Sequence, residues 1–308
     1  MAHSIGTPAF LTSFIMVVLF LLSIDLGIFN RRAHIVTVKE ALVWSIVWLV
    51  LSLSFGAYIF KAFGRQNGLE FLAGYLIEYA LSVDNVFVFI LIFSYFAVPA
   101  RFHHRILFWG ILGALIMRAS FIIAGAALIT MFHWILYIFG AFLVFTGIKI
   151  LRQGDAEVEP QRNPVVKLFR RFVPMTSDYE SGKFFQRHKG KILATPLALV
   201  LVTVEVTDLV FATDSIPAIF GITQDPFIVY TSNICAILGL RSMYFLLSAV
   251  VDRFVYLGKG LGIILSFIGL KMLLGGFYAI SIELSLGIVA AILTASVVLS
   301  LLCPPKNR

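Results

Sequence analysis

Long apolar runs recur along this sequence, and they limit its fold more than any other feature. Two examples are LTSFIMVVLFLLSIDLGIF at 11–29 and LVWSIVWLVLSLSFGAYIF at 42–60. A helix of about 20 residues crosses the hydrocarbon core of a bilayer, and lipid offers no partner to exposed backbone groups. Only 13% of the 308 residues are charged, about half the share in a typical soluble domain. The sequence therefore predicts an all-α polytopic membrane protein, with a single transmembrane domain over residues 1–308.

Nine segments have the length and apolar character of a spanning helix. We expect them near 9–29, 41–63, 69–97, 106–130, 132–151, 195–221, 227–250, 258–278 and 282–302. The first run could be mistaken for a signal peptide. It has no basic residue before it and no small-residue cleavage site, and it carries Asp25 near its end. These features favour a spanning helix over a cleaved leader.

The connections between the segments differ in their basic residues. Lys and Arg in the connections and tails number 18 on one side of the membrane and two, Lys61 and Arg65, on the other. Because basic loops remain in the cytoplasm, the N-terminus is predicted outside and the C-terminus inside. The one long connection, about 152–194, is predicted to be a cytoplasmic linker whose basic part lies on anionic lipid. The net charge of +8 follows from these loops, so we expect no nucleic acid partner.

Two stretches, about 69–151 and about 195–278, resemble each other. Charged and polar residues recur in the same order in both: Glu78 matches Asp208, Asp84 matches Asp214, Asn85 matches Ser215, Arg118 matches Arg241, and Lys149 matches Lys271. Each stretch spans three helices, so an odd number of crossings turns the second copy upside down. Inverted repeats are typical of transporters whose sites lie near the midplane. An old duplication in a protein that transports nothing is the alternative.

Several carboxylates fall near the middle of their predicted spans: Glu78, Asp84, Glu205, Asp208 and Asp214, with Asp25 and Glu70 nearer the ends. A charge at that depth costs roughly 3 kcal/mol on insertion scales. These acids could form structural ion pairs with Arg118, Arg241 and Lys271. The acids outnumber the bases, which favours a cation site, although the matched arginines could still hold Glu78 and Asp208.

The oxygen-rich set of side chains favours a hard cation. The predicted metal ligands are Asp84, Asp214, Glu78, Asn85, Glu205, Asp208 and Ser215. Carboxylate, amide and hydroxyl oxygens suit Mn²⁺, Mg²⁺ or Ca²⁺, and paired acids could also carry protons. We expect His103 and His104 to be solvated in a cytoplasmic turn, and His133 to lie at a membrane boundary. Pro217 frees a helix carbonyl, which predicts a broken or bulged helix at 213–217.

The motifs AGYLIEYALSVDNVFVF, ATPLALVLVTVEVTDLVFATDSIPAIFGIT and TSNICAILGLRSMYFLL resemble the bacterial TerC family, and within it the Alx branch. The resemblance covers most of the chain from about 70 to 275. It implies a multi-pass protein of the bacterial inner membrane associated with manganese export, alkaline-induced expression and, in some relatives, tellurite resistance. A chloroplast branch of the family is linked to protein insertion into thylakoids.

Two functions are compatible with these features. The first is a secondary transporter that exports a divalent cation, with Mn²⁺ as the expected substrate, Mg²⁺ or Ca²⁺ as alternatives and proton coupling through the same acids. The second is a scaffold for membrane-protein biogenesis or tellurite-type stress resistance that moves no metal. We expect no enzymatic activity and no organic cofactor, because the sequence has no nucleophile–base pair, His-rich metal motif or P-loop.

Overall fold

The computed structural model describes residues 4–24, 37–132, 134–153, 173–176, 182–188, 191–248, 256–275 and 280–302. Its helices are α1 (Pro8–Ile24), α2 (Val38–Phe63), α3 (Arg65–Tyr95), α4 (Ala100–Met131), α5 (Ile135–Gln153), α7 (Pro196–Phe220), α8 (Pro226–Leu238), α9 (Leu240–Leu247), α10 (Leu257–Leu274) and α11 (Ile282–Leu302). Asp25 and His133 lie outside the described residues.

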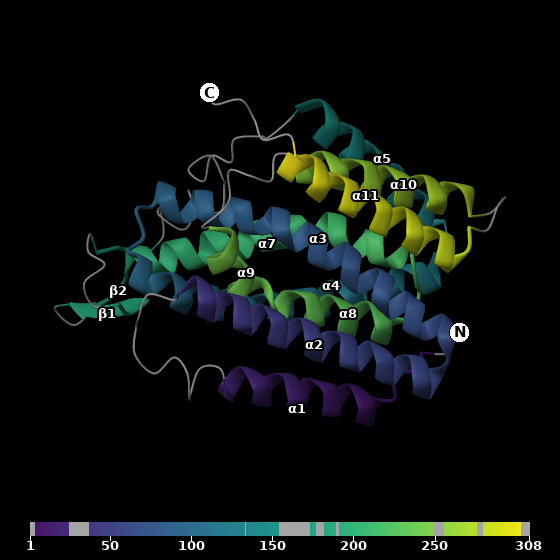
Figure 1. The fold of residues 1–308 in the computed structure, drawn as a ribbon. Coiled ribbons are helices and arrows are strands. Elements are labelled where there is room, and N and C mark those ends of the chain that lie inside the picture. Colours follow the sequence, from purple (N-terminus) through teal and green to yellow (C-terminus); the bar gives the residue numbers. More distant parts are fainter. Residues whose placement is uncertain are drawn as a thin grey trace.

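Helices make up nearly all of the described structure, and they pack as a bundle with roughly aligned axes (Figure 1). Seven of the described helices are long and apolar enough to cross a membrane: α2, α3, α4, α5, α7, α10 and α11. Helix α1 is shorter, at 17 residues, and the span predicted at 227–250 is built from α8 and α9. The predicted all-α polytopic class is confirmed. The total of nine spans and the inverted repeat remain predictions.

Burial separates inner helices from outer ones. In α3, 62% of the most apolar window is buried, whereas α2 and α5 bury 17% each. Helix α3 packs against α2, α7, α8, α9 and α11, so it lies at the centre of the bundle. A helix surrounded by protein can carry polar side chains that lipid would not tolerate. Helix α3 is therefore the element best placed to position a buried polar site.

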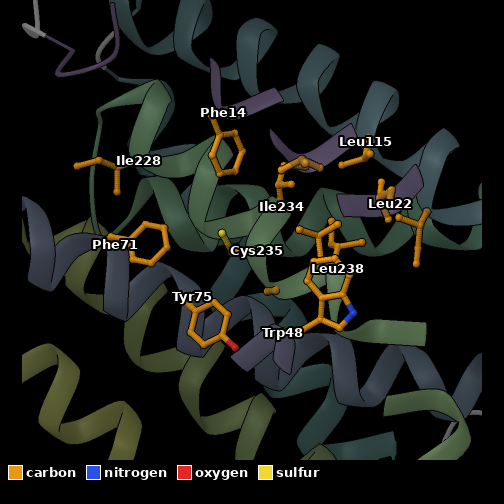
Figure 2. Packing of buried hydrophobic residues seen from close by; sticks show 14 of the residues in the cluster. Phe14, Leu22, Trp48, Phe71, Tyr75, Leu115, Ile228, Ile234, Cys235 and Leu238 are labelled. Carbon is orange, nitrogen blue, oxygen red and sulfur yellow. The ribbon is translucent and has the colours of Figure 1, made fainter. Parts of the chain in front are cut away.

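A hydrophobic cluster joins α1, α2, α3 and α8. Figure 2 shows Cys235 in the middle of this cluster, among Phe14, Phe71 and Tyr75. Phe10 of α1 also stacks on Phe227 of α8, with ring centroids 4.6 Å apart. Lipid tails are as apolar as these side chains, so close packing rather than water exclusion holds such helices together. These contacts fix α1, the outermost helix of that side in Figure 1, to the bundle.

Helices α5 and α10 approach each other closely through four glycines. A Cβ on Gly140 would lie 2.9 Å from the carbonyl oxygen of Gly269, and one on Gly262 would lie 3.0 Å from that of Gly147. In the register that matches Lys149 with Lys271, Gly140 corresponds to Gly262 and Gly147 to Gly269. The contact of Gly140 with Gly269 therefore has a matching contact of Gly262 with Gly147. Such reciprocal contacts are what a two-fold relation between the helices requires.

The predicted break at 213–217 is wrong. Helix α7 runs without interruption from Pro196 to Phe220, with Pro217 inside it. Proline removes one hydrogen bond, to the carbonyl of Thr213, and residues 215–220 are all buried. Neighbouring helices therefore keep the backbone helical at this point. The interruption lies elsewhere, at Gly239, where α8 ends and α9 begins.

The long connection contains a structure that the sequence did not predict. Strands β1 (Phe185–His188) and β2 (Lys191–Ala194) form an antiparallel hairpin, which projects from one end of the bundle (Figure 1). The hairpin is attached to α4 because Arg105 Nη1 donates to the carbonyl of Gly182 and the guanidinium lies over the Phe184 ring. Residues 154–172 lie outside the described part.

Candidate functional site

A row of polar side chains lies on the buried face of α3. Glu78, Ser82 and Asn85 are at most 3% exposed, and their spacing of four and three residues places them on one side of the helix. Asp208 and Ser215 on α7 are separated by seven residues and are also buried, at 4% and 1% exposed. The matched residues Glu78/Asp208 and Asn85/Ser215 therefore point into the protein interior from two adjacent helices.

Arg118 of α4 joins these helices. Its Nε and Nη2 atoms donate to the two carboxylate oxygens of Asp208, at 3.1 Å and 2.9 Å, which is the planar pairing that arginine makes best. Its Nη1 atom donates to Glu78 and, at 3.1 Å, to Asn233 Oδ1 on α8. We call Arg118, Glu78, Asp208 and Asn233 the Arg118 cluster. It connects α3, α4, α7 and α8.

The Arg118 cluster has one basic side chain for two acidic ones. Arg118 and Glu78 are 0% exposed, so solvent does not screen either charge. If both acids were ionised, the formal charge of the cluster would be −1. A buried excess of negative charge is costly unless a proton or a cation compensates for it. The geometry thus favours a positively charged ligand near Glu78.

Unpartnered polar atoms lie around the cluster. Among the described residues, the buried atoms Glu78 Oε2, Ser82 Oγ, Asn85 Nδ2, Ser215 Oγ and Asn233 Nδ2 have no hydrogen-bond partner in the protein. The Ser215 hydroxyl lies near the Glu78 carboxylate, but the two groups do not form a standard hydrogen bond. Buried polar atoms are almost always satisfied. A group of such atoms is therefore where water or an ion is expected.

The other predicted ligands are spread along α3 and α7. Glu205 is half-buried one turn before Asp208, and the absence of a side chain on Gly113 leaves room for its carboxylate. Asp214 is also half-buried and interacts with Thr146 and Lys149 of α5 rather than with Arg118. Asp84 belongs to α3, but its side chain lies outside the described part.

A preassembled metal site is not present in the part of the chain that the structure describes, where no three Asp, Glu, His or Cys side chains converge. Of the seven predicted ligands, the structure brings Glu78, Asp208 and Ser215 together and places Asn85 on the same face as Glu78. Asp214 is apart from them, on the side of α5.

The second matched arginine has different surroundings. Arg241 of α9 is 5% exposed and lines a small pocket with Glu40 and Trp44 of α2, His104 of α4, Ser242 and Phe245. We call this the α9 pocket. The matched residues Arg118 and Arg241 therefore have different surroundings in the structure. Arg118 bonds to Glu78 and Asp208, and Arg241 lines the α9 pocket.

The prediction for the two histidines is wrong. His103 and His104 lie in the first turns of α4 and are half-buried. His103 Nε2 donates to the carbonyl of Val98 at 2.9 Å, and its Nδ1 pairs with the Tyr244 hydroxyl at 3.0 Å. The apolar surroundings of α9 draw these side chains into contact, so His103 links α4 to α9 instead of facing solvent.

Comparison with known proteins places the chain in a family. Residues 63–308 match the model of the integral membrane protein TerC family. The chain belongs to the TerC family. It is 50% identical over 299 residues to an uncharacterised membrane protein of Myxococcus xanthus, STKORF319, covering 97% of this chain and 94% of that protein. It is 49% identical over 307 residues to Escherichia coli K12 Alx, described as a proposed membrane-bound redox modulator, with 97% and 96% covered.

A third relative, the Alx protein of Photorhabdus laumondii, is 43% identical over 309 residues, with 97% and 96% covered. No solved structure gives a significant match. These relatives align with 97% of the chain, so the alignments include most of α1 and α2, whereas the family model begins at residue 63.

Sequence reasoning missed three residues of this TerC-family site. Ser82 and Asn233 are fully buried polar side chains. Asn233 belongs to the Arg118 cluster, Ser82 lies one turn after Glu78 on α3, and Thr146 interacts with Asp214. Asn233 could have been recognised from the sequence, because an amide within the apolar stretch TSNICAIL needs a buried partner. Ser82 and Thr146 could not, since serine and threonine also satisfy themselves on the carbonyl one turn earlier in a helix.

Proposed function

We propose that this protein is a secondary transporter that exports a divalent metal cation, with Mn²⁺ as its substrate. The observation that carries the proposal is the Arg118 cluster with its surplus of buried acid and its unpartnered oxygens. Residues that cost free energy inside a membrane mark ion pathways, and oxygen donors are those that Mn²⁺ accepts.

The acids divide into two roles under this proposal. Asp208 is occupied on both oxygens by Arg118, so it positions the cluster rather than binding metal directly. Asp84 and Asp214 are the central ligands, with Asn85, Ser215 and the free oxygen of Glu78 adding further donors. Because no three-acid site is assembled among the described residues, the metal site forms when α3 and α7 move or when Asp84 completes it.

Transport in this scheme uses an ion gradient rather than a nucleotide. Protons are the proposed coupling ion, since Glu78 and Glu205 are acids that could exchange a proton for the metal. We further propose that the protein lies in the inner membrane, with its N-terminus outside and its C-terminus in the cytoplasm, as the distribution of Lys and Arg favours.

Metal flux into proteoliposomes containing the purified protein tests the proposal. We expect Asp84→Asn and Asp214→Asn each to abolish Mn²⁺ flux while the proteins remain folded. Asp225→Asn is a matched control, because Asp225 caps α8 away from the cluster by accepting from the backbone of Phe227. Undiminished flux in both Asp84→Asn and Asp214→Asn, or no flux in the wild type, would reject the proposal and favour the scaffold alternative.

A thiol-based redox function finds no comparable support in the geometry. Cys235 is the free cysteine of the described residues, and it is buried at 6% exposure within the packed cluster of Figure 2. A redox-active cysteine needs access to its partner thiol or oxidant.

A further inference from the structure

The matched arginines Arg118 and Arg241 occupy two different versions of the same local structure. Arg118 lies on an uninterrupted α4 and reaches the two acids. Arg241 follows the break at Gly239 and lies in the α9 pocket beside Glu40. In the register that pairs the arginines, Gly239 corresponds to Ile116, where α4 continues as a regular helix.

Two helix contacts near these arginines are nearly symmetric. Gly74 of α3 packs against Ser232 of α8, and Gly110 of α4 packs against Val204 of α7. In the register that matches Glu78 with Asp208, Gly74 corresponds to Val204. In the register that matches the two arginines, Ser232 corresponds to Trp109, the residue before Gly110. Together with the reciprocal glycine contacts of α5 and α10, these contacts are compatible with a two-fold relation between the two stretches.

Symmetry also defines the alternative arrangement. Arg118 belongs to the first repeat and binds Asp208 in the second. The two-fold counterpart of that ion pair is Arg241 of the second repeat bound to Glu78 of the first. In the structure, Arg118 bonds to both Glu78 and Asp208. A protein built from two inverted halves can reach a second state by exchanging the conformations of those halves.

We propose that Arg118 and Arg241 alternate on the Glu78–Asp208 pair, with the α8–α9 junction at Gly239 as the hinge. This inference rests on the proposed transport function. In the second state, α8 and α9 form one straight helix and Arg241 binds Glu78. Helix α4 then bends near Ile116 and carries Arg118 away from the acids. In each state one guanidinium binds the two acids. The Glu78–Asp208 pair therefore keeps one uncompensated negative charge, which a cation can neutralise, in both states.

A double-mutant cycle on Mn²⁺ flux in proteoliposomes tests the exchange. We expect Arg241→Gln to reduce flux by about tenfold or more, and to have little further effect once Glu78→Gln is present, because contacting residues are coupled. Residues that never meet act additively, so an additive result would overturn the proposal. Glu40→Gln is the matched control, since a loss of flux equal to that of Arg241→Gln would show that Arg241 acts through the α9 pocket alone.

Thiol cross-linking of the metal-free protein provides an independent test. In a Cys235→Ser, Cys303→Ser background, the pairs Glu78→Cys with Arg118→Cys and Glu78→Cys with Arg241→Cys are treated with a bifunctional maleimide. We expect both pairs to cross-link, and Glu78→Cys with Arg187→Cys on the hairpin not to. Cross-linking of the Arg118 pair alone would overturn the exchange even if the wild type transports Mn²⁺. Cross-linking of both pairs in a protein without flux would instead reject only the transport function.

Discussion

The guanidinium of Arg118 and the carboxylate of Asp208 form a two-bond ion pair between α4 and α7, with N···O distances of 3.1 Å and 2.9 Å. The same guanidinium also donates to Glu78 of α3. A single basic side chain thus holds two acids that the sequence places 130 positions apart. This arrangement leaves the charge of one acid without a matching base, and the functional proposal follows from that surplus.

Removal of the Arg118 charge should destabilise the protein. Breaking a buried ion pair costs about 3–5 kcal/mol, because the remaining charges stay buried without a partner. Arg118→Gln should therefore lower the melting temperature in detergent markedly, and Arg118→Lys should lower it less, since lysine cannot make the two parallel bonds. Arg187→Gln is the control, because Arg187 is exposed on β1. Equal melting of Arg118→Gln and wild type would show that the cluster does not hold the helices together.

A methyl group at the α5–α10 contact should separate these helices. The Cβ of Gly269→Ala would lie 2.8 Å from the backbone nitrogen of Val144 and even closer to the carbonyl of Gly140, so the backbones must move. Gly287→Ala on α11 meets nothing within 4 Å and should be neutral or stabilising by up to about 1 kcal/mol. Thermal unfolding of the two variants checks this contrast, and a similar response from both would contradict the close packing.

The turn between α3 and α4 should be improved by glycine. Ala97 has φ of 47°, and the N–H of Val98 bonds to the carbonyl of Phe93, so the helix ends in a left-handed cap that glycine ordinarily occupies. Ala97→Gly removes the steric cost of that conformation, which is about 1 kcal/mol, although extra flexibility in the unfolded state offsets part of the gain. A lower melting temperature for Ala97→Gly than for wild type would contradict this account of the turn.

Metal binding should be visible as stabilisation. A ligand at about 100 times its Kd raises the free energy of unfolding by about 2.7 kcal/mol. Mn²⁺ should therefore raise the melting temperature of the wild type and of Asp225→Asn, but not that of Asp84→Asn or Asp214→Asn. A shift of equal size in all four proteins would place the bound metal outside the proposed site.

The sequence predicted the helical class and the buried acids, because apolar length and the cost of burying charge act locally on each segment. It named the two matched arginines as possible partners of Glu78 and Asp208, but it did not predict that Arg118 would bind both acids. Both Glu78 and Asp208 bind Arg118 of α4, whereas the matched Arg241 lies on α9, which packs against α2. Two matching sequence patterns can therefore have different surroundings.

Helix interruptions were also misplaced for a physical reason. Pro217 removes one hydrogen bond, but buried neighbours keep α7 helical. Gly239 has an ordinary φ value, yet α8 ends there and α9 begins at the next residue. The backbone conformation of this glycine alone does not explain the interruption. Tertiary packing decides such positions in a membrane bundle. The hairpin of β1 and β2 escaped prediction because its short strands carry mixed polar and apolar residues within a basic loop.

The most direct measurement is an anomalous-scattering map from crystals of the wild-type protein soaked in Mn²⁺. We predict one strong peak in the protein interior between α3 and α7, with oxygen atoms of Asp84 and at least one of Asn85, Asp214 or Ser215 about 2.0–2.5 Å from the metal. We also predict that Arg118 stays bonded to Asp208. A map without an interior peak, or with metal only on surface carboxylates, would contradict the proposed site and the transport function that depends on it.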